Sequence, residues 1–306
     1  MIPRSPECDD DLDLCLKQIN ELFDVLGMLD KTLQKQHLVG YYLTNKFWQR
    51  LWSYDGFFHY GISYDGRYKK DDLREQLRLI ERYIHSTGAS KVLELAYGLG
   101  ANSAFLARRN PDVTFDAIDI SNKPLRRYTS LPNLRFQFCD YHDLSPLHTS
   151  YDLVFIIEAL CCSTDKAQVF REVKKKLRPG GKFIIFDGYI QRRAAPLNRS
   201  EERMWGLIAK SFSINEVERL GDVEEYMHEE YSIEAAQDLS EYILPSVMRL
   251  RPYVRFYFNH PVCARIVNRL MPFDGVKNTI HLLLLPISIH RQTGCYYMHV
   301  LTNDRV

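Results

Sequence analysis

The segment Val92–Ser103, which reads VLELAYGLGANS, places the strongest constraint on how this chain can fold. An apolar run passes into two glycines, Gly98 and Gly100, and the helix-favouring residues Ala104–Ala107 follow. This order predicts a buried strand, a tight turn and the start of a helix, where a ligand can approach the backbone and meet helix N–H groups. Taken alone, the pattern fits several nucleotide and nucleoside cofactors, and also a turn that binds no ligand.

Strand-like and helix-like segments alternate after this point. The expected strands are residues 92–96, 113–119, 134–139, 151–158 and 182–187, and the expected helices are residues 102–109, 121–130 and 165–177. Such alternation predicts a doubly wound, mostly parallel α/β sheet with right-handed crossovers. Residues 295–301 are expected to pair with residues 231–236 as an antiparallel edge, which leaves a helical insertion between them.

The residues before the sheet are expected to form a helical lid. Apolar spacing predicts one amphipathic helix from Leu14 to about Leu38 and another over residues 71–86. The aromatic-rich residues 41–61 between them suit a ligand cover, because rings provide apolar contact with few rotamers to freeze; a core seam is the alternative. We therefore expect three regions: an N-terminal lid and substrate region (1–86), an α/β cofactor core (87–190), and a helical substrate-binding insertion with the final edge strands (191–306).

Charge and cysteine content argue against several functions. Lys plus Arg total 40 and Asp plus Glu total 39, so no overall field attracts nucleic acid or anionic membranes. The seven cysteines have neither zinc-site nor disulfide-framework spacing, so no metal is expected and a reducing, cytoplasmic location is favoured. The sequence starts without a signal-peptide pattern, and no run approaches the ~18 apolar residues that span a bilayer.

One stretch near the end of the chain departs from this balance. Residues 244–277 combine Arg and Lys with aromatic side chains, and Asp274 is their only acid. Three interpretations stay open: a solvated helical face, a peripheral contact with a membrane surface, or the wall of a pocket for an anionic or apolar substrate.

Two acids stand where ligands bind in sheets of this kind, at the carboxyl ends of strands. Asp119 ends the second expected strand and can accept hydrogen bonds from both ribose hydroxyls of a nucleoside. Asp140 follows the third strand and can accept an adenine amino hydrogen. Capping of the following segment is the alternative for each acid.

Four segments in this order resemble class I S-adenosylmethionine-dependent methyltransferases. They are residues 92–100, similar to the first motif of the family; Asp119, similar to its ribose acid; residues 140–144, similar to its adenine-side segment; and residues 177–181, similar to the turn before its fifth strand. The resemblance covers residues 41–187 and implies a Rossmann-like methyltransferase sheet with S-adenosylmethionine as cofactor. Residues 41–47, 52–61 and 156–159 are similar to segments of the sterol, tocopherol, prenyl diphosphate and cyclopropane-fatty-acid group.

The resemblance implies which residues hold the cofactor. Glu94 would hold its methionine amino end directly or through water, Asp119 its ribose and Asp140 its adenine. The rest of the implied cofactor site is Tyr41, Ala96, Tyr97, Gly98, Gly100, Asn102, Ile120 and Tyr141. Ala96 stands where the family has its first glycine and Tyr97 where it has a small residue, so the methionine end must be held differently or Tyr97 takes part.

The expected reaction is methyl transfer to a small, largely hydrophobic acceptor such as a lipid or terpenoid, with carbon slightly favoured over oxygen or nitrogen. Methylation of an alkene creates a carbocation, and the groups expected to stabilise it are Glu158, Tyr60, Phe57 and Phe58. A hydroxyl or amine acceptor favours His59 as base, because its unperturbed pKa lies nearest neutrality. Trp205 is expected to contact the substrate. The alternatives are an RNA or protein methyltransferase and a catalytically silent binding partner; a homodimer also fits.

Overall fold

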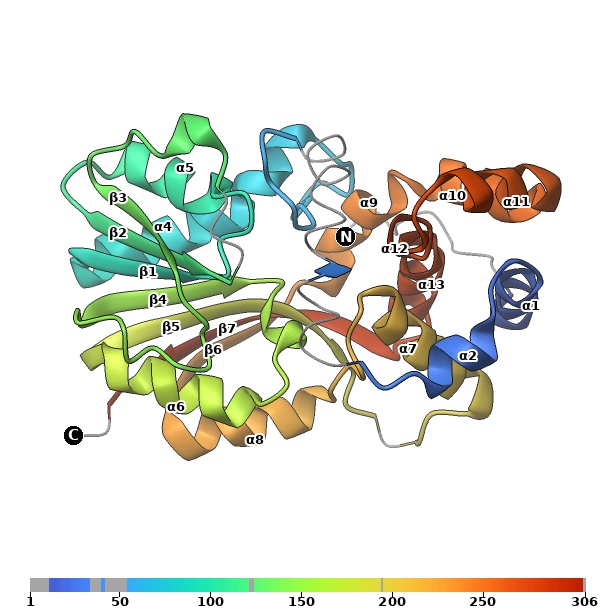
Figure 1. The fold of residues 1–306 in the computed structure, drawn as a ribbon. Coiled ribbons are helices and arrows are strands. Elements are labelled where there is room, and N and C mark those ends of the chain that lie inside the picture. Colours follow the sequence, from blue (N-terminus) through green and yellow to red (C-terminus); the bar gives the residue numbers. More distant parts are fainter. Residues whose placement is uncertain (1–10, 34–39, 42–53, 121–123, 194, 305–306) are drawn as a thin grey trace.

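The computed structural model describes residues 11–33, 40–41, 54–120, 124–193 and 195–304. Within these residues, a seven-stranded sheet has the order β3-β2-β1-β4-β5-β7-β6 (Figure 1). Its strands are β1 (Lys91–Leu95), β2 (Thr114–Asp119), β3 (Leu134–Phe138), β4 (Tyr151–Ile157), β5 (Leu177–Ile190), β6 (Ser232–Asp238) and β7 (Gly294–Thr302). Strands β1 to β5 are parallel to their neighbours, and β7 is antiparallel to both β5 and β6.

The expected mostly parallel α/β sheet is therefore confirmed. The antiparallel pairing of residues 231–236 with 295–301 is confirmed as well, with Ile233 opposite Leu301. The antiparallel strand β7 lies one position in from the edge, and β6 forms the edge itself. The expected turn at residues 178–181 is an irregularity inside β5, where the pairing with β4 shifts register between Tyr151 and Leu153.

Helices cover both faces of the sheet because strand side chains alternate between its two sides. On one face α4 (Glu75–Thr87) and α5 (Ala101–Arg109) pack on Phe115, Phe155 and Phe186. On the other face α6 (Lys166–Lys176) and α8 (Leu220–Glu230) pack on Leu93, Val154 and Ile185. Short 3₁₀ segments link these elements: η1 (Lys70–Arg74), η2 (Arg126–Tyr128) and η3 (Leu160–Cys162).

The remaining helices form a cap beyond the carboxyl ends of the parallel strands (Figure 1). This helical cap consists of α1 (Leu12–Leu22), α2 (Val25–Asp30), α7 (Arg199–Ser211), α9 (Ser240–Met248), α10 (Arg251–Asn259), α11 (Pro261–Leu270), α12 (Phe273–Val276) and α13 (Asn278–His290). Apolar residues of α1, α2, α7, α10 and α13 share a third buried cluster. The helices α9 to α13 form the expected insertion between β6 and β7.

Two helix predictions are wrong. The helix expected from Leu14 to Leu38 ends at Leu22, because Phe23 is extended and the Asp24 carboxylate accepts a hydrogen bond from the Gly27 N–H (3.1 Å), which starts α2. Residues 34–39 lie outside the described residues. The helix expected over residues 121–130 is reduced to η2, since Leu125 is extended before it; residues 121–123 lie outside the described residues.

No helix among the described residues combines the length and the apolar content that a bilayer crossing requires. No group of three or more His, Cys, Asp or Glu side chains among them is arranged to hold a metal ion.

Candidate functional site

A cavity of about 680 Å³ lies where the carboxyl ends of the strands meet the helical cap. Most of the residues expected from the sequence line it: Tyr41, Phe57, Phe58, His59, Tyr60, Ala96, Tyr97, Gly98, Asn102, Asp119, Ile120, Asp140, Tyr141, Glu158 and Trp205. Glu94 and Gly100 do not. The part of the wall that the cap supplies is mainly apolar and includes Ile208, Phe212, Ile243, Val254, Leu282, Leu285 and Ile289.

The turn after β1 brings backbone groups to the cavity. Ala96, Gly98 and Gly100 have positive φ values of 57°, 56° and 84°. The Gly98 N–H donates to the Asp119 carboxylate (3.0 Å), which places that acid beside the turn. A Cβ at Gly100 would lie 2.8 Å from the Phe136 ring, so this glycine allows close packing behind the turn.

Glu94 does not line the cavity, so a role toward the methionine amino end of the cofactor stays a prediction. Its side chain is buried, and its carboxylate accepts hydrogen bonds from the Ser103 N–H (3.1 Å) and hydroxyl and from the Asn102 amide (3.0 Å). Burial raises the pKa of Glu94 to about 7, although these hydrogen bonds oppose the rise. Glu94 thus fixes the first turn of α5 and orients Asn102, which does line the cavity.

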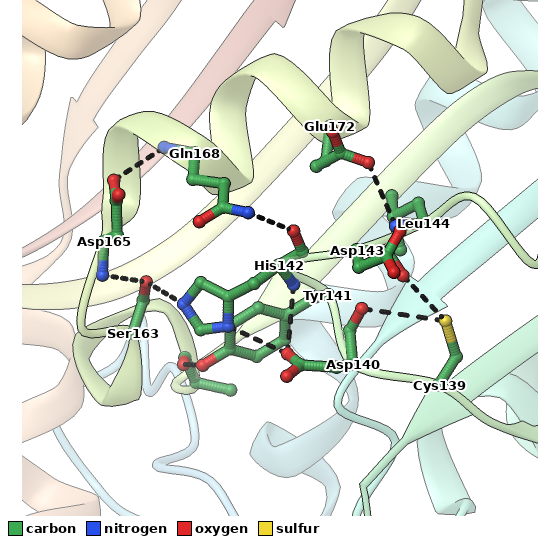
Figure 2. Close-up of polar contacts among 11 residues, drawn as sticks. Cys139, Asp140, Tyr141, His142, Asp143, Leu144, Ser163, Asp165, Gln168 and Glu172 are labelled. Carbon is green, nitrogen blue, oxygen red and sulfur yellow. Dashed lines mark hydrogen bonds and ion pairs between the residues drawn. The ribbon is translucent and has the colours of Figure 1, made fainter. Parts of the chain in front are cut away.

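The segment after β3 is held by a side-chain network (Figure 2). Asp140 Oδ1 accepts a hydrogen bond from the His142 N–H (3.0 Å) and lies 2.8 Å from His142 Nδ1. His142 Nε2 lies 2.8 Å from Ser163 Oγ, and the Gln168 side chain donates to the His142 carbonyl (2.7 Å). Asp140 therefore organises its own segment, as the capping alternative expected, while it also lines the cavity.

Glu158 lies at the end of β4 with a positive φ of 50°, an uncommon backbone conformation that often marks a functional position. Its Oε1 accepts hydrogen bonds from the Tyr60 N–H (2.8 Å) and the Tyr296 hydroxyl (3.0 Å). Burial raises the pKa of Glu158 to about 8, and both hydrogen bonds oppose the rise. The carboxyl group is therefore largely protonated at neutral pH until a nearby cation lowers its pKa.

His59 has a different protonation behaviour from the one expected. Burial lowers its pKa to about 4, so the ring is neutral and a weak base, and the argument from an unperturbed pKa near neutrality is wrong. Nδ1 lies 3.1 Å from the Tyr60 carbonyl oxygen. Nε2 is buried without a hydrogen-bond partner among the described residues.

The aromatic residues around His59 have unequal exposure. Phe57 is buried against Phe105 and belongs to the main core, whereas Phe58 is 55% exposed. Trp205 is buried, and its indole Nε1 has no hydrogen-bond partner among the described residues. The Tyr41 hydroxyl donates to Asn278 (2.6 Å). The remaining residues of the expected tyrosine-bearing segment and lid, 42–53, lie outside the described residues.

Sequence reasoning missed several residues of this site. Tyr296 comes from β7, 138 residues after Glu158, and only the pairing of β7 with β5 brings it there. Asp187 is buried and accepts hydrogen bonds from the Cys161 N–H (2.9 Å) and the Gly188 N–H (2.8 Å). The predicted strand 182–187, which ends in Asp187, was a usable signal, because acids near the carboxyl ends of neighbouring parallel strands share one edge of the sheet.

The polar groups of the cavity fit S-adenosylmethionine. The Asn102 Oδ1 is buried beside the His59 imidazole and Asn102 lines the cavity; a carbonyl oxygen has two lone pairs, so it can accept from an ammonium group as well. The Asp119 carboxylate suits ribose hydroxyls. The cavity volume lies within the usual range for cofactor and small-molecule sites.

Sequence comparisons identify the central part of the chain. Residues 93–183 match the family model described as a methyltransferase domain. Methyltransferase GfsG of Streptomyces halstedii is 30% identical over 116 residues, 36% of this chain and 41% of that protein. The 27-O-demethylrifamycin SV methyltransferase of Amycolatopsis mediterranei is 27% identical over 168 residues, 51% of this chain and 59% of that protein. The matches thus span between two fifths and three fifths of these relatives.

Solved structures show the same fold over most of the chain. The [4+2]-cyclase SpnF matches with a TM-score of 0.62 and 16% identity, over 88% of this chain and 93% of that one. Geranyl diphosphate C-methyltransferase from Streptomyces coelicolor A3(2) matches with a TM-score of 0.59 and 13% identity, over 86% of this chain and 98% of that one.

A doubly wound sheet with a glycine turn after β1 and an acid after β2 defines an α/β protein that binds a nucleoside-containing cofactor. The family match makes that assignment specific. Over residues 93–183 the chain is similar to the methyltransferase-domain family, and this similarity supports S-adenosylmethionine as the cofactor.

Proposed function

We propose that the protein transfers a methyl group from S-adenosylmethionine to a small, largely hydrophobic acceptor, with carbon slightly favoured over oxygen or nitrogen. The observation that carries this proposal is the continuity of the cavity. Asp119 and Asp140 line it at the strand ends, and apolar side chains of the cap such as Phe212 and Leu282 line the same space. A cofactor and an apolar acceptor can therefore share one enclosure, which excludes water from the reacting atoms.

The residues at the strand ends would hold the cofactor. The Asp119 carboxylate would accept hydrogen bonds from the ribose hydroxyls, and Asn102 Oδ1 from the ammonium group. The segment Asp140–His142 would contact the adenine. When bound, the cofactor supplies an electrophilic methyl carbon attached to a positively charged sulfur.

Glu158 would act on the acceptor. A positive charge in the cavity lowers the pKa of this carboxyl from about 8 and favours its ionised form. The carboxylate could then take a proton from the acceptor or stabilise positive charge that develops on a carbon atom. Tyr60 and Tyr296 would orient it through the hydrogen bonds described above. The low pKa of His59 supports Glu158 over the imidazole as the proton acceptor.

The names of similar proteins support an apolar acceptor class. They include a probable phthiotriol/phenolphthiotriol dimycocerosates methyltransferase of Mycobacterium ulcerans, 32% identical over 32% of this chain and 39% of that protein. The rifamycin and geranyl diphosphate methyltransferases named above belong to the same broad range of lipids, polyketides and terpenoids. We carry over to this chain only that range.

A second candidate function is cofactor binding without methyl transfer. Two observations favour it: Ala96 and Tyr97 replace small residues of the family motif and line the cavity, and the structurally similar SpnF is a cyclase by name.

Calorimetry followed by a transfer assay would test both functions. We expect S-adenosylmethionine and its demethylated product to bind, and radiolabelled methyl to reach at least one prenyl diphosphate, sterol, hydroxylated lipid or phenol. Failure of a folded sample to bind either cofactor form would contradict the proposal. Binding without transfer to any of these acceptors would favour the second function. Transfer to RNA or protein alone would show that the acceptor is a macromolecule and not a small hydrophobic compound.

We also propose a cytoplasmic location, because the spacing of the seven cysteines is not that of a disulfide framework and the cytoplasm is reducing. A homodimer stays a prediction, and sedimentation of the purified protein would test it.

A further inference from the structure

Helix α11 carries an exposed apolar ridge. Val262, Ile266 and Leu270 recur every four residues, which places them on one side of the helix, and they are 68%, 56% and 78% exposed. Another side holds the helix to the protein, through buried Ala264 and through Asn268, which accepts from the Tyr257 hydroxyl (2.5 Å). The apolar ridge is therefore not the side that anchors α11.

Basic residues lie beside this ridge. Arg265 and Arg269 are both exposed and, four residues apart, form a row parallel to it. Helix α10, which immediately precedes α11, adds the exposed rings of Tyr253 (72%) and Phe256 (57%), whereas its Arg251 and Arg255 are half-buried and donate to the sulfur atoms of Met248 and Cys15. Asp274, the acid of residues 244–277, forms an ion pair with Lys277 (2.7 Å). We call the exposed apolar and basic side chains of these two helices the α10–α11 surface.

The α10–α11 surface is continuous with the cavity. Tyr253 of α10 lines the cavity although it is largely exposed. Val267 of α11 also lines the cavity and is 38% exposed. The cavity wall and the outer surface therefore meet at these two helices, which stand at the outer end of the helical cap (Figure 1).

We propose that the α10–α11 surface docks on an anionic lipid bilayer, and that the acceptor enters the cavity from the lipid. Exposed aliphatic and aromatic side chains flanked by arginines are the composition that interfacial helices use, with apolar groups among acyl chains and guanidinium groups at the phosphates. A second copy fits less well, because a two-fold contact over this surface would cover Arg265 and Arg269 of both copies, and residues 251–270 contain no acid to pair with them. RNA would leave the apolar ridge in water. Entry of the acceptor rests on the proposed function, whereas docking does not.

Vesicle sedimentation with the full chain would test the docking. We expect binding to vesicles of phosphatidylcholine with 30% phosphatidylglycerol, as a typical anionic mixture, and much weaker binding to phosphatidylcholine alone or at high salt. Arg265→Gln with Arg269→Gln should weaken the binding about 30-fold, since each basic residue near an anionic surface contributes roughly fivefold. Ile266→Ser with Leu270→Ser, which leaves the charge unchanged, should weaken it at least tenfold through lost apolar insertion, about 0.8 kcal/mol per CH₂ removed from the lipid.

The matched control is Arg82→Gln with Arg171→Gln, two exposed arginines on α4 and α6 at the other end of the molecule. This pair removes the same charge and should change vesicle binding less than threefold. Thermal unfolding of each variant shows that the fold is retained.

Three results would overturn the proposal. One is the absence of binding to anionic vesicles, and another is an equal loss of binding in the control and the α11 variants. The third is a dimer that binds no vesicles and that Ile266→Ser with Leu270→Ser converts to a monomer, because a second copy would then cover the ridge. None of these measurements depends on methyl transfer, so a failed docking and a failed function would be told apart. If both hold, the α11 variants should lower turnover of a vesicle-borne acceptor and not of a dispersed one.

Discussion

The two ends of the cavity are constructed from different kinds of contacts. At the cofactor end, polar groups meet partners close in sequence: Glu94 and Asn102 are 8 residues apart, and Gly98 and Asp119 are 21 apart. At the cap end, segments distant in sequence come together, as when Tyr41 meets Asn278 across 237 residues. The first end can therefore be recognised from short motifs, whereas the second depends on tertiary packing.

Among the variants that test this contrast, Asp119→Ala is expected to have the largest effect. We expect at least a 100-fold loss of affinity for the demethylated cofactor, because two hydrogen bonds to a charged group contribute about 1.5–3 kcal/mol each. Calorimetry measures the loss. Asp112→Ala removes the same charge from an exposed loop and should bind normally. Normal binding by Asp119→Ala would mean that the cofactor lies elsewhere.

The next test is Glu158→Gln, at the junction of the two ends. Turnover should fall about 100-fold, the lower range for loss of a general acid or base, while cofactor affinity changes less than threefold. In the wild type the rate should rise with pH through an apparent pKa below 8, because the carboxyl must lose its proton and the cofactor cation favours that loss. The variant should lack this rise. Glu225→Gln, an exposed control on α8, should keep it.

At the cap end, Leu282→Trp should fill part of the acceptor space. We expect the KM of the acceptor to rise about tenfold, in line with an overpacking cost of 1–3 kcal/mol, and the cofactor affinity to stay within twofold. Leu282→Met conserves volume and serves as the control. A comparable loss of cofactor affinity would show that the two ends are not separate.

The smallest effect is expected for Tyr296→Phe. Its hydroxyl donates to Glu158 and lowers the pKa of that carboxyl, so its removal should move the rising part of the pH–rate profile upward by about one unit. Tyr297→Phe, the neighbouring residue whose side chain points to the other face of the sheet, should leave the profile in place. A purely structural role for Tyr296 would change stability without moving the profile.

The same contrast explains what the sequence could predict. The sheet and the positions of Asp119, Asp140 and Glu158 at its strand ends were predicted because each acid stands at or just after the end of a strand-like segment. The break between α1 and α2 was missed. The apolar residues keep helical spacing through this region, so the pattern gave no sign that the Asp24 side chain caps a new helix. The protonation of His59 could not be predicted, since its pKa depends on burial that only the fold creates. The division into three regions stays a prediction.

The helical insertion between β6 and β7 has a consequence for how such proteins diversify. Residues 239–293 connect β6 to β7, and these two strands are paired in the sheet. The whole insertion is therefore one long connection between neighbouring strands. Doubling the length of such a connection costs only about 0.6 kcal/mol of loop-closure entropy. Natural variation or a designed graft between Asp238 and Gly294 therefore exchanges much of the apolar part of the cavity wall that the helical cap supplies, while the strands at the cofactor end keep their register.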